Sequence, residues 1–116
     1  MADQATEYLD LDDGLTRVRG NMTLFKQMLN LFLVSEEFQA FEDAIESNDN
    51  KMAEAKIHGI KGLSGNLSMP ALFSTSSILN EQLRTGEADP VTLAEYREAY
   101  KKTREYIVDF MAADNT

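Results

Sequence analysis

The residues best suited to chemistry lie in one short stretch, AKIHGIKGLSGNL at 55–67. This stretch contains the chain's only histidine, His58, a lysine three residues later, Lys61, and glycines at 59, 62 and 65. A neutral imidazole is a nucleophile at cellular pH, and a nearby ammonium group stabilises an anion held on the ring. Histidine, cation and cleared space together suit the transient holding of a phosphoryl group.

The glycines are costly in a segment that otherwise has a helical pattern. Each costs a helix interior about 1 kcal/mol relative to alanine, and breaks of a local rule are expected mainly where function demands them. On a helical wheel Gly62 and Gly65 fall on the side of His58, where a partner's backbone could approach the imidazole closely. The glycines could also be close contacts between packed helices.

The opposite side of this segment is apolar and is expected to face the core. Its residues are Ala53, Ile60 and Leu67, with Leu63 on the flank. Lys56 falls near the same side, so its ammonium group must extend past the apolar contacts to reach water. This geometry leaves His58 on the exposed side of the helix. The alternative to a functional role is that His58 is an ordinary surface histidine.

Helical segments with short connections surround this stretch. Apolar spacing, caps and breaks predict them at 12–19, 22–47, 51–68, 70–84 and 90–113. The last has a narrow apolar seam formed by Leu93, Tyr96, Tyr100, Thr103, Ile107 and Phe110. We therefore expect an all-α fold, an antiparallel four-helix bundle with a short additional N-terminal helix, built as a single domain over 1–116.

The second segment has apolar residues on two sides. A stripe predicts one continuous helix with a buried face, and consists of Leu24, Met28, Leu31, Phe38 and Ile45. The adjacent Phe25, Leu29 and Phe32 overfill that face. We expect these three to extend an apolar docking patch around His58.

Composition excludes several functions. Without cysteine there is no thiol catalysis and no disulfide, and one histidine cannot form a multi-histidine metal site. A net charge of −9 disfavours binding to nucleic acid or anionic membranes. There is no secretion signal, no membrane-spanning run and no phosphate-binding glycine loop. We expect a cytoplasmic protein whose partner brings its own metal and phosphoryl acceptor.

The run HGIKGLSGNL at 58–67 resembles the signature of histidine-containing phosphotransfer (HPt) domains, HxxKGxxGN followed by small and apolar positions. The matching residues are His58, Lys61, Gly62, Gly65 and Asn66. The lead-in YLDLDDGLTRVRGNMTLFKQMLNLF at 8–32 is similar to the family's opening, so the resemblance covers essentially the whole chain.

The resemblance implies a phosphorelay protein of two-component signal transduction. His58 would accept a phosphoryl group from a receiver domain's phosphoaspartate and pass it to another receiver, with Lys61 stabilising the phosphate. The docking surface would be formed by Gly62, Gly65, Asn66 and Ser64. Implied partners are response-regulator receivers or a hybrid sensor histidine kinase, with Mg²⁺ on the receiver. The chain itself would be a monomer without cofactor, nucleotide site or autokinase activity.

Two other functions fit the same residues. An HPt-like docking module could bind a receiver or kinase without carrying phosphate, and the phosphoacceptor domain of a chemotaxis-type kinase would look similar. At single positions, Asn66 and Ser64 could simply cap or bond back to the helix, and Glu54 could orient the imidazole or be an ordinary exposed carboxylate. The chain departs from the family pattern at Gly59 and at Ser68, where a glycine is common.

Overall fold

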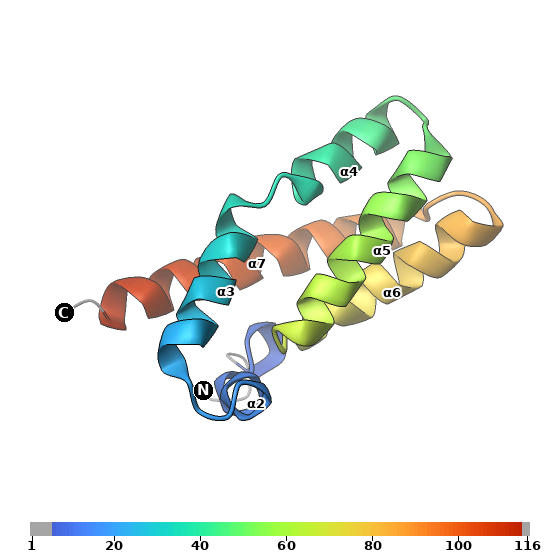
Figure 1. Cartoon of the computed structure of the whole chain (residues 1–116). Helices are drawn as coiled ribbons and strands as arrows, with labels where there is room; N and C mark the ends of the chain where they lie inside the picture. Colours follow the sequence, from blue (N-terminus) through green and yellow to red (C-terminus); the bar gives the residue numbers. More distant parts are fainter. Residues whose placement is uncertain (1–5, 115–116) are drawn as a thin grey trace.

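The computed structural model describes residues 6–114, and within that range every regular element is a helix. The elements are α2 (Leu11–Arg17), α3 (Met22–Val34), α4 (Glu37–Glu46), α5 (Asn50–Asn66), α6 (Pro70–Thr85) and α7 (Pro90–Asp114). Figure 1 shows α5 and α6 as an antiparallel pair, with α4 beside α5 and the long α7 beside α6. The predicted all-α class is confirmed. No helix in the described range is long and apolar enough to cross a membrane.

The segment predicted as one helix over 22–47 is two helices, and this part of the prediction is wrong. The break lies at Ser35, whose backbone is extended with φ −66° and ψ 138°. Two hydrogen bonds between backbone and side chains satisfy two of the backbone groups at the break. Arg104 Nη1 donates to the carbonyl oxygen of Leu33 at 3.0 Å, and the Glu37 N–H donates to Ser35 Oγ at 3.2 Å.

The break changes which side of α3 is buried. Phe25, Leu29 and Phe32 are at most 1% exposed, so they belong to the core and do not extend a docking patch. Leu24 and Leu31, predicted to be buried, are 41% and 65% exposed. Both sides of α3 are apolar, and the bend after Val34 turns the side with the phenylalanines inward.

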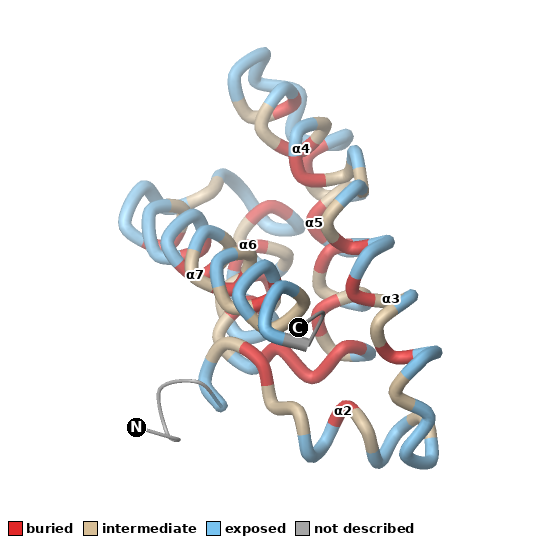
Figure 2. The backbone as a smooth tube through the Cα atoms, turned by 90° about the vertical axis from the view of Figure 1, so that its left-hand side faces the viewer, coloured by how far each residue is buried: buried red, intermediate tan, exposed pale blue. Residues whose placement is uncertain are grey.

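Aromatic side chains join α4 to α7 across the core. The rings of Phe38 and Tyr100 stack with centroids 4.3 Å apart, and Phe41 meets Tyr96 edge to face at 5.2 Å. Such pairs contribute about 0.5–1.5 kcal/mol beyond the area they bury. The predicted seam of the last segment is confirmed at Tyr96, Thr103 and Ile107, which are buried, and is half-buried at Leu93, Tyr100 and Phe110. Figure 2 shows buried positions recurring along the inward sides of the helices.

The turn between α5 and α6 is fastened to the N-terminal part of the chain. Ser68 adopts a left-handed backbone conformation, φ 60°, which a glycine would adopt more readily. Its carbonyl oxygen accepts a hydrogen bond from the Asp10 N–H at 2.8 Å, and its hydroxyl donates to Asp13 Oδ2 at 2.6 Å. The serine therefore offsets its backbone strain with a contact that glycine could not make.

We expect the Ser68–Asp13 contact to make stability depend on acid pH. The hydrogen bond from Ser68, and then that from Arg17, lower the pKa of the Asp13 carboxyl below its ordinary value of 3.8. A carboxyl with a lowered folded pKa stabilises the fold above the unfolded pKa, and this contribution is lost as pH falls through the folded value. Ser68→Ala should therefore lose less stability than wild type when urea unfolding is compared at pH 7 and pH 3.

Ser77→Ala is the matched control, because the Ser77 hydroxyl donates to a carbonyl oxygen of its own helix, that of Phe73, and touches no carboxylate. Its acid dependence should equal that of wild type. An equal acid dependence for Ser68→Ala and wild type would contradict this assignment.

Substitution of Gly14 tests how closely α2 packs against α3. This buried glycine of α2 lies against the Phe25 ring, and an added Cβ would meet ring atoms at 2.6 Å. Because that ring is 1% exposed and cannot swing away, Gly14→Ala should destabilise the fold by about 1–3 kcal/mol in urea unfolding. Gly86→Ala, where the nearest atom is 3.9 Å away, should change stability by less than about 0.5 kcal/mol.

Candidate functional site

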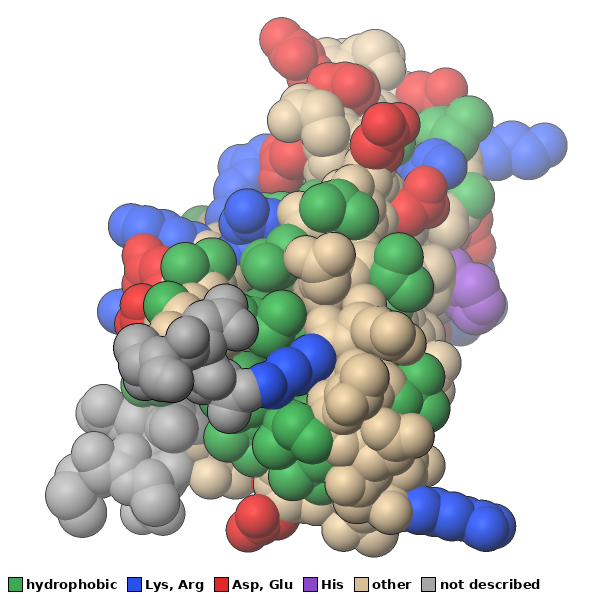
Figure 3. All heavy atoms as spheres, turned by 60° about the vertical axis from the view of Figure 1, so that its left-hand side comes forward, with side chains coloured by type: hydrophobic (Ala, Val, Ile, Leu, Met, Phe, Trp, Pro, Cys, Tyr) green, Lys and Arg blue, Asp and Glu red, His purple; other side chains and the backbone are tan. Residues whose placement is uncertain are grey.

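His58 lies on the exposed side of α5 because the opposite side is fixed in the core. The helix is capped by Asp49, whose carboxylate accepts a hydrogen bond from the Met52 N–H at 3.1 Å. Its inward side is formed by Ala53, Ile57, Ile60 and Ser64, with Leu67 just beyond its end. Figure 3 shows the histidine side chain, in purple, standing out from the surface.

The predicted core side of this helix is confirmed. Ala53, Ile60 and Leu67 are fully buried, and Leu63 is half-buried. Lys56 reaches outward as expected, and its Nζ lies 3.2 Å from Glu37 Oε2 on α4. That ion pair links α4 to α5 on the side away from α6.

Lys61 follows His58 by one helical turn and is half-buried. Among residues 6–114, neither side chain has a hydrogen bond or ion pair to a protein group, and Glu54 does not bond to the imidazole. The Lys61 ammonium and the imidazole are therefore both available to a group that arrives from outside.

The three glycines of α5 have different surroundings. A Cβ built on Gly62 meets nothing within 4 Å, so this position is open surface one turn from His58. At Gly65 a Cβ would lie 3.1 Å from the Phe73 ring, so this glycine admits a side chain of α6. At Gly59 the nearest atom is Glu37 Oε1 at 3.8 Å, an ordinary contact. Gly62 and Gly65 were both predicted to leave open space beside His58. In the structure Gly62 is on the exposed side, whereas Gly65 lies at a contact with α6.

The two remaining predicted site residues, Asn66 and Ser64, do not lie on one common surface. Asn66 is exposed at the end of α5, about two turns beyond His58. Ser64 is fully buried, and its hydroxyl donates to the carbonyl oxygen of Lys61 at 2.9 Å. Ser64 therefore bonds back to its own helix and cannot be part of an exposed docking surface.

A groove adjoins His58 between α5 and α6. It has a volume of about 560 Å³ and is lined by Lys51, Glu54, Ala55, His58, Asn80 and Arg84. Arg84 also forms an ion pair with Glu81, and the side-chain oxygen of Asn80 is buried without a hydrogen-bond partner among the described residues. Lys51 and Arg84 bring two cations to this groove in a chain of net charge −9, beside the carboxylate of Glu54.

Asn80 and Arg84 were not predicted from the sequence, because their place beside His58 follows only from the register of α5 and α6. In an antiparallel helix pair, residues equally far from the turn face each other. Gly65 faces Phe73, so seven residues earlier on α5 and seven later on α6 place His58 opposite Asn80. Arg84 follows one turn further along α6.

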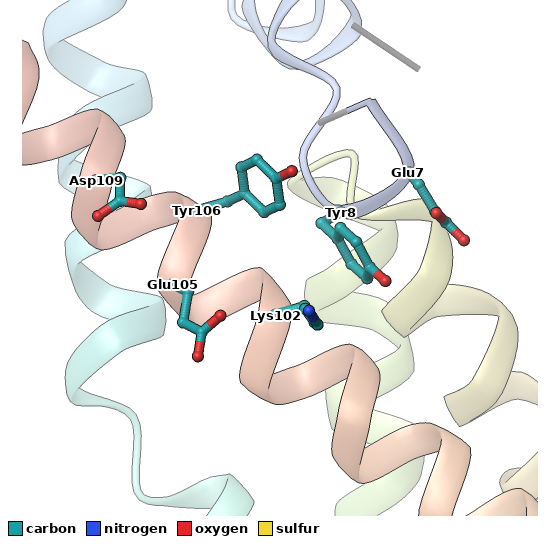
Figure 4. Close-up of a pocket in the computed structure, with 6 residues that line it drawn as sticks. All are labelled: Glu7, Tyr8, Lys102, Glu105, Tyr106 and Asp109. Atoms are coloured by element: carbon teal, nitrogen blue, oxygen red, sulfur yellow. The ribbon is translucent and has the colours of Figure 1, made fainter. Parts of the chain in front are cut away.

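A second hollow lies far along the chain from the histidine groove. It has a volume of about 400 Å³ and is lined by Glu7, Tyr8, Lys102, Glu105, Tyr106 and Asp109. Figure 4 shows α7 providing four of these side chains, while Tyr8 approaches Tyr106 from the N-terminal segment. The two tyrosine rings stack with centroids 5.5 Å apart. This hollow offers no group comparable to an exposed imidazole with a neighbouring cation.

The chemistry of the site is that of an accessible imidazole beside cations. In the described part of the chain, no three His, Cys, Asp or Glu side chains are grouped so that they could hold a metal ion. No protein-family model, curated protein or solved structure matches this chain.

Gly62 provides a structural test of the open surface. Gly62→Ala should raise the free energy of unfolding by about 0.5–1 kcal/mol, because alanine favours the helix and its methyl group meets no neighbour. Gly65→Ala should gain less, because the Phe73 ring must first shift. Urea unfolding of both variants measures the difference, and equal gains would show that the Phe73 contact costs nothing.

Proposed function

We propose that this chain is a phosphorelay histidine phosphotransfer protein of the HPt class, with His58 as the phosphoryl carrier. The observation that carries the proposal is the exposed imidazole of His58 on a helix whose next turn provides Lys61 and the open position Gly62. The sequence motif and this arrangement support each other, since the motif residues that would meet a partner lie on one side of α5.

The proposed step moves one phosphoryl group between two nucleophiles. A lone pair of an imidazole nitrogen attacks the phosphorus of a receiver's aspartyl phosphate, the N–P bond forms, and the P–O bond to the carboxylate breaks. The aspartate leaves with that electron pair, and the reverse step loads a second receiver. The receiver supplies Mg²⁺, and the Lys61 ammonium offsets negative charge on the phosphoryl oxygens.

The docking surface for the receiver has two parts. Around His58, the open Gly62 lets the partner's backbone approach, and the cations of the groove attract the acidic residues that hold a receiver's Mg²⁺. On α3, exposed apolar side chains replace the phenylalanines first expected there; these are Leu24, Leu31 and Val34. Figure 3, which brings the α3 side forward, has hydrophobic side chains and the histidine in the same view.

The proposed function implies a particular arrangement of the helices. We take α3 and α4 as one bent rod that packs with α5, α6 and α7 as an antiparallel four-helix bundle, with α2 as the short additional N-terminal helix. The protein would act as a monomer, as the resemblance to HPt domains implies.

The proposal predicts base-stable, acid-labile labelling at a single residue. A labelled phospho-receiver should transfer its phosphoryl group to wild type and not to His58→Gln, because a phosphoramidate bond on histidine survives base and breaks in acid. Lys61→Ala should keep the label site but slow transfer by about 10- to 100-fold, as expected for loss of one stabilising charge. Quench-flow with gel autoradiography measures both.

Gly62→Ala and Gly59→Ala form a matched pair for the docking contribution. Both place a methyl group on the exposed part of α5, but only Gly62 lies on the side of His58, so only its variant should slow transfer. Small-molecule phosphoramidate labels a competent histidine without docking. If wild type takes label from neither donor while receivers still bind it, the carrier proposal fails and a docking module replaces it.

A further inference from the structure

The break between α3 and α4 is held open by two side chains. In a continuous helix the Glu37 N–H would donate to the carbonyl oxygen of Leu33, four residues earlier. Here each of these groups has a separate partner, Ser35 Oγ at 3.2 Å and Arg104 Nη1 at 3.0 Å. We call Ser35 and Arg104 the latch. The latch thus satisfies both partners of this one helical bond, the Glu37 N–H and the Leu33 carbonyl oxygen.

The exposed apolar side chains of α3 are those that a continuous helix would bury. If α4 is extended backwards at 100° per residue, Val34, Leu31 and Leu24 fall within about 40° of the buried Phe38. These residues are 64%, 65% and 41% exposed in the structure. On the same wheel Phe25, Leu29 and Phe32, now buried, fall about 120–180° from Phe38.

We propose that α3 has two arrangements, the latched one described above and a joined one in which α3 and α4 form a single helix. In the joined arrangement α3 is turned about its axis, so that Leu24, Leu31 and Val34 pack inward and Phe25, Leu29 and Phe32 leave the core. The latched arrangement buries two phenylalanine rings and is the major state. A minor state separated by a small free-energy difference is populated at about 0.1–10%.

The proposal of two arrangements does not depend on the proposed function. Its consequence for a binding partner does rest on that function. Joining exchanges the apolar side chains that α3 exposes, from Leu24, Leu31 and Val34 to Phe25, Leu29 and Phe32, while leaving His58 on α5 in place. A receiver that binds only the latched arrangement then shifts the population toward it, by as much as its affinities for the two states differ.

The test removes the hydrogen bonds of the latch by substitution and follows the backbone conformation at the break by NMR. In Ser35→Ala/Arg104→Met, Cα chemical shifts of residues 34–37 should move toward helical values and the Glu37 amide should become protected from hydrogen exchange. Arg97→Met is the matched control. Arg97 lies two turns earlier on α7 and binds Glu42 with its Nη2 2.6 Å from Oε1, but it does not touch the break, so its variant should leave these shifts unchanged.

A thiol probe gives an independent readout, because the chain has no cysteine. In a Leu31→Cys background, weakening the latch should slow maleimide labelling at residue 31, about twofold if the joined state reaches half of the molecules. Shifts and labelling rates equal to those of Arg97→Met would overturn the proposal.

If the double variant does not fold, the proposal is tested by NMR relaxation dispersion in wild type and in the single variant Ser35→Ala. Wild type should show relaxation dispersion in residues 22–37, larger in Ser35→Ala and abolished in Glu36→Pro. Ser35 already has a conformation suited to precede proline, so Glu36→Pro keeps the break and forbids joining. Flat dispersion in both wild type and Ser35→Ala would show a static break.

Discussion

The contact between the α5–α6 turn and the N-terminal segment is the constraint on which the site depends. Ser68 must hold a left-handed backbone conformation for α6 to return along α5, and Asp10 and Asp13 hold it there. With that turn fixed, Gly65 meets Phe73 and the register of the two helices follows. The same register brings Asn80 and Arg84 to the groove beside His58. Chemistry on one helix thus depends on a turn about three helical turns away.

α5 could be predicted from the sequence because its signals agree. Asp49 caps its start, Pro70 begins the next helix, and one side alone is apolar, so the exposed position of His58 followed from periodicity. The groove beside His58 could not be predicted from periodicity, because its formation depends on the relative position of two helices. That position comes from one ring against one glycine, a contact between side chains that no local pattern contains.

α3 shows the opposite case, in which local signals conflict. Both of its sides are apolar, so periodicity allowed two answers, and the sequence analysis chose the side continuous with Phe38. The break that reverses this choice depends on Arg104, which is 71 residues from Leu33 in the chain. A long-range hydrogen bond of this kind leaves no trace in the residues around Ser35. Composition and helical period therefore predict which helices form more readily than which of two apolar faces is buried.

The ion pairs of α4 have a mechanical consequence. Glu42 binds Arg97 of α7, and Glu37 binds Lys56 of α5, so α4 is tied to its neighbours on both sides. The bidentate contact of Glu42 also raises the pKa of the Arg97 guanidinium, so this tie keeps its charge at any physiological pH. α4 is therefore anchored on the two helices beside it, and α3 is joined to that anchored unit through the contact of the Phe32 and Phe38 rings, whose centroids lie 4.8 Å apart.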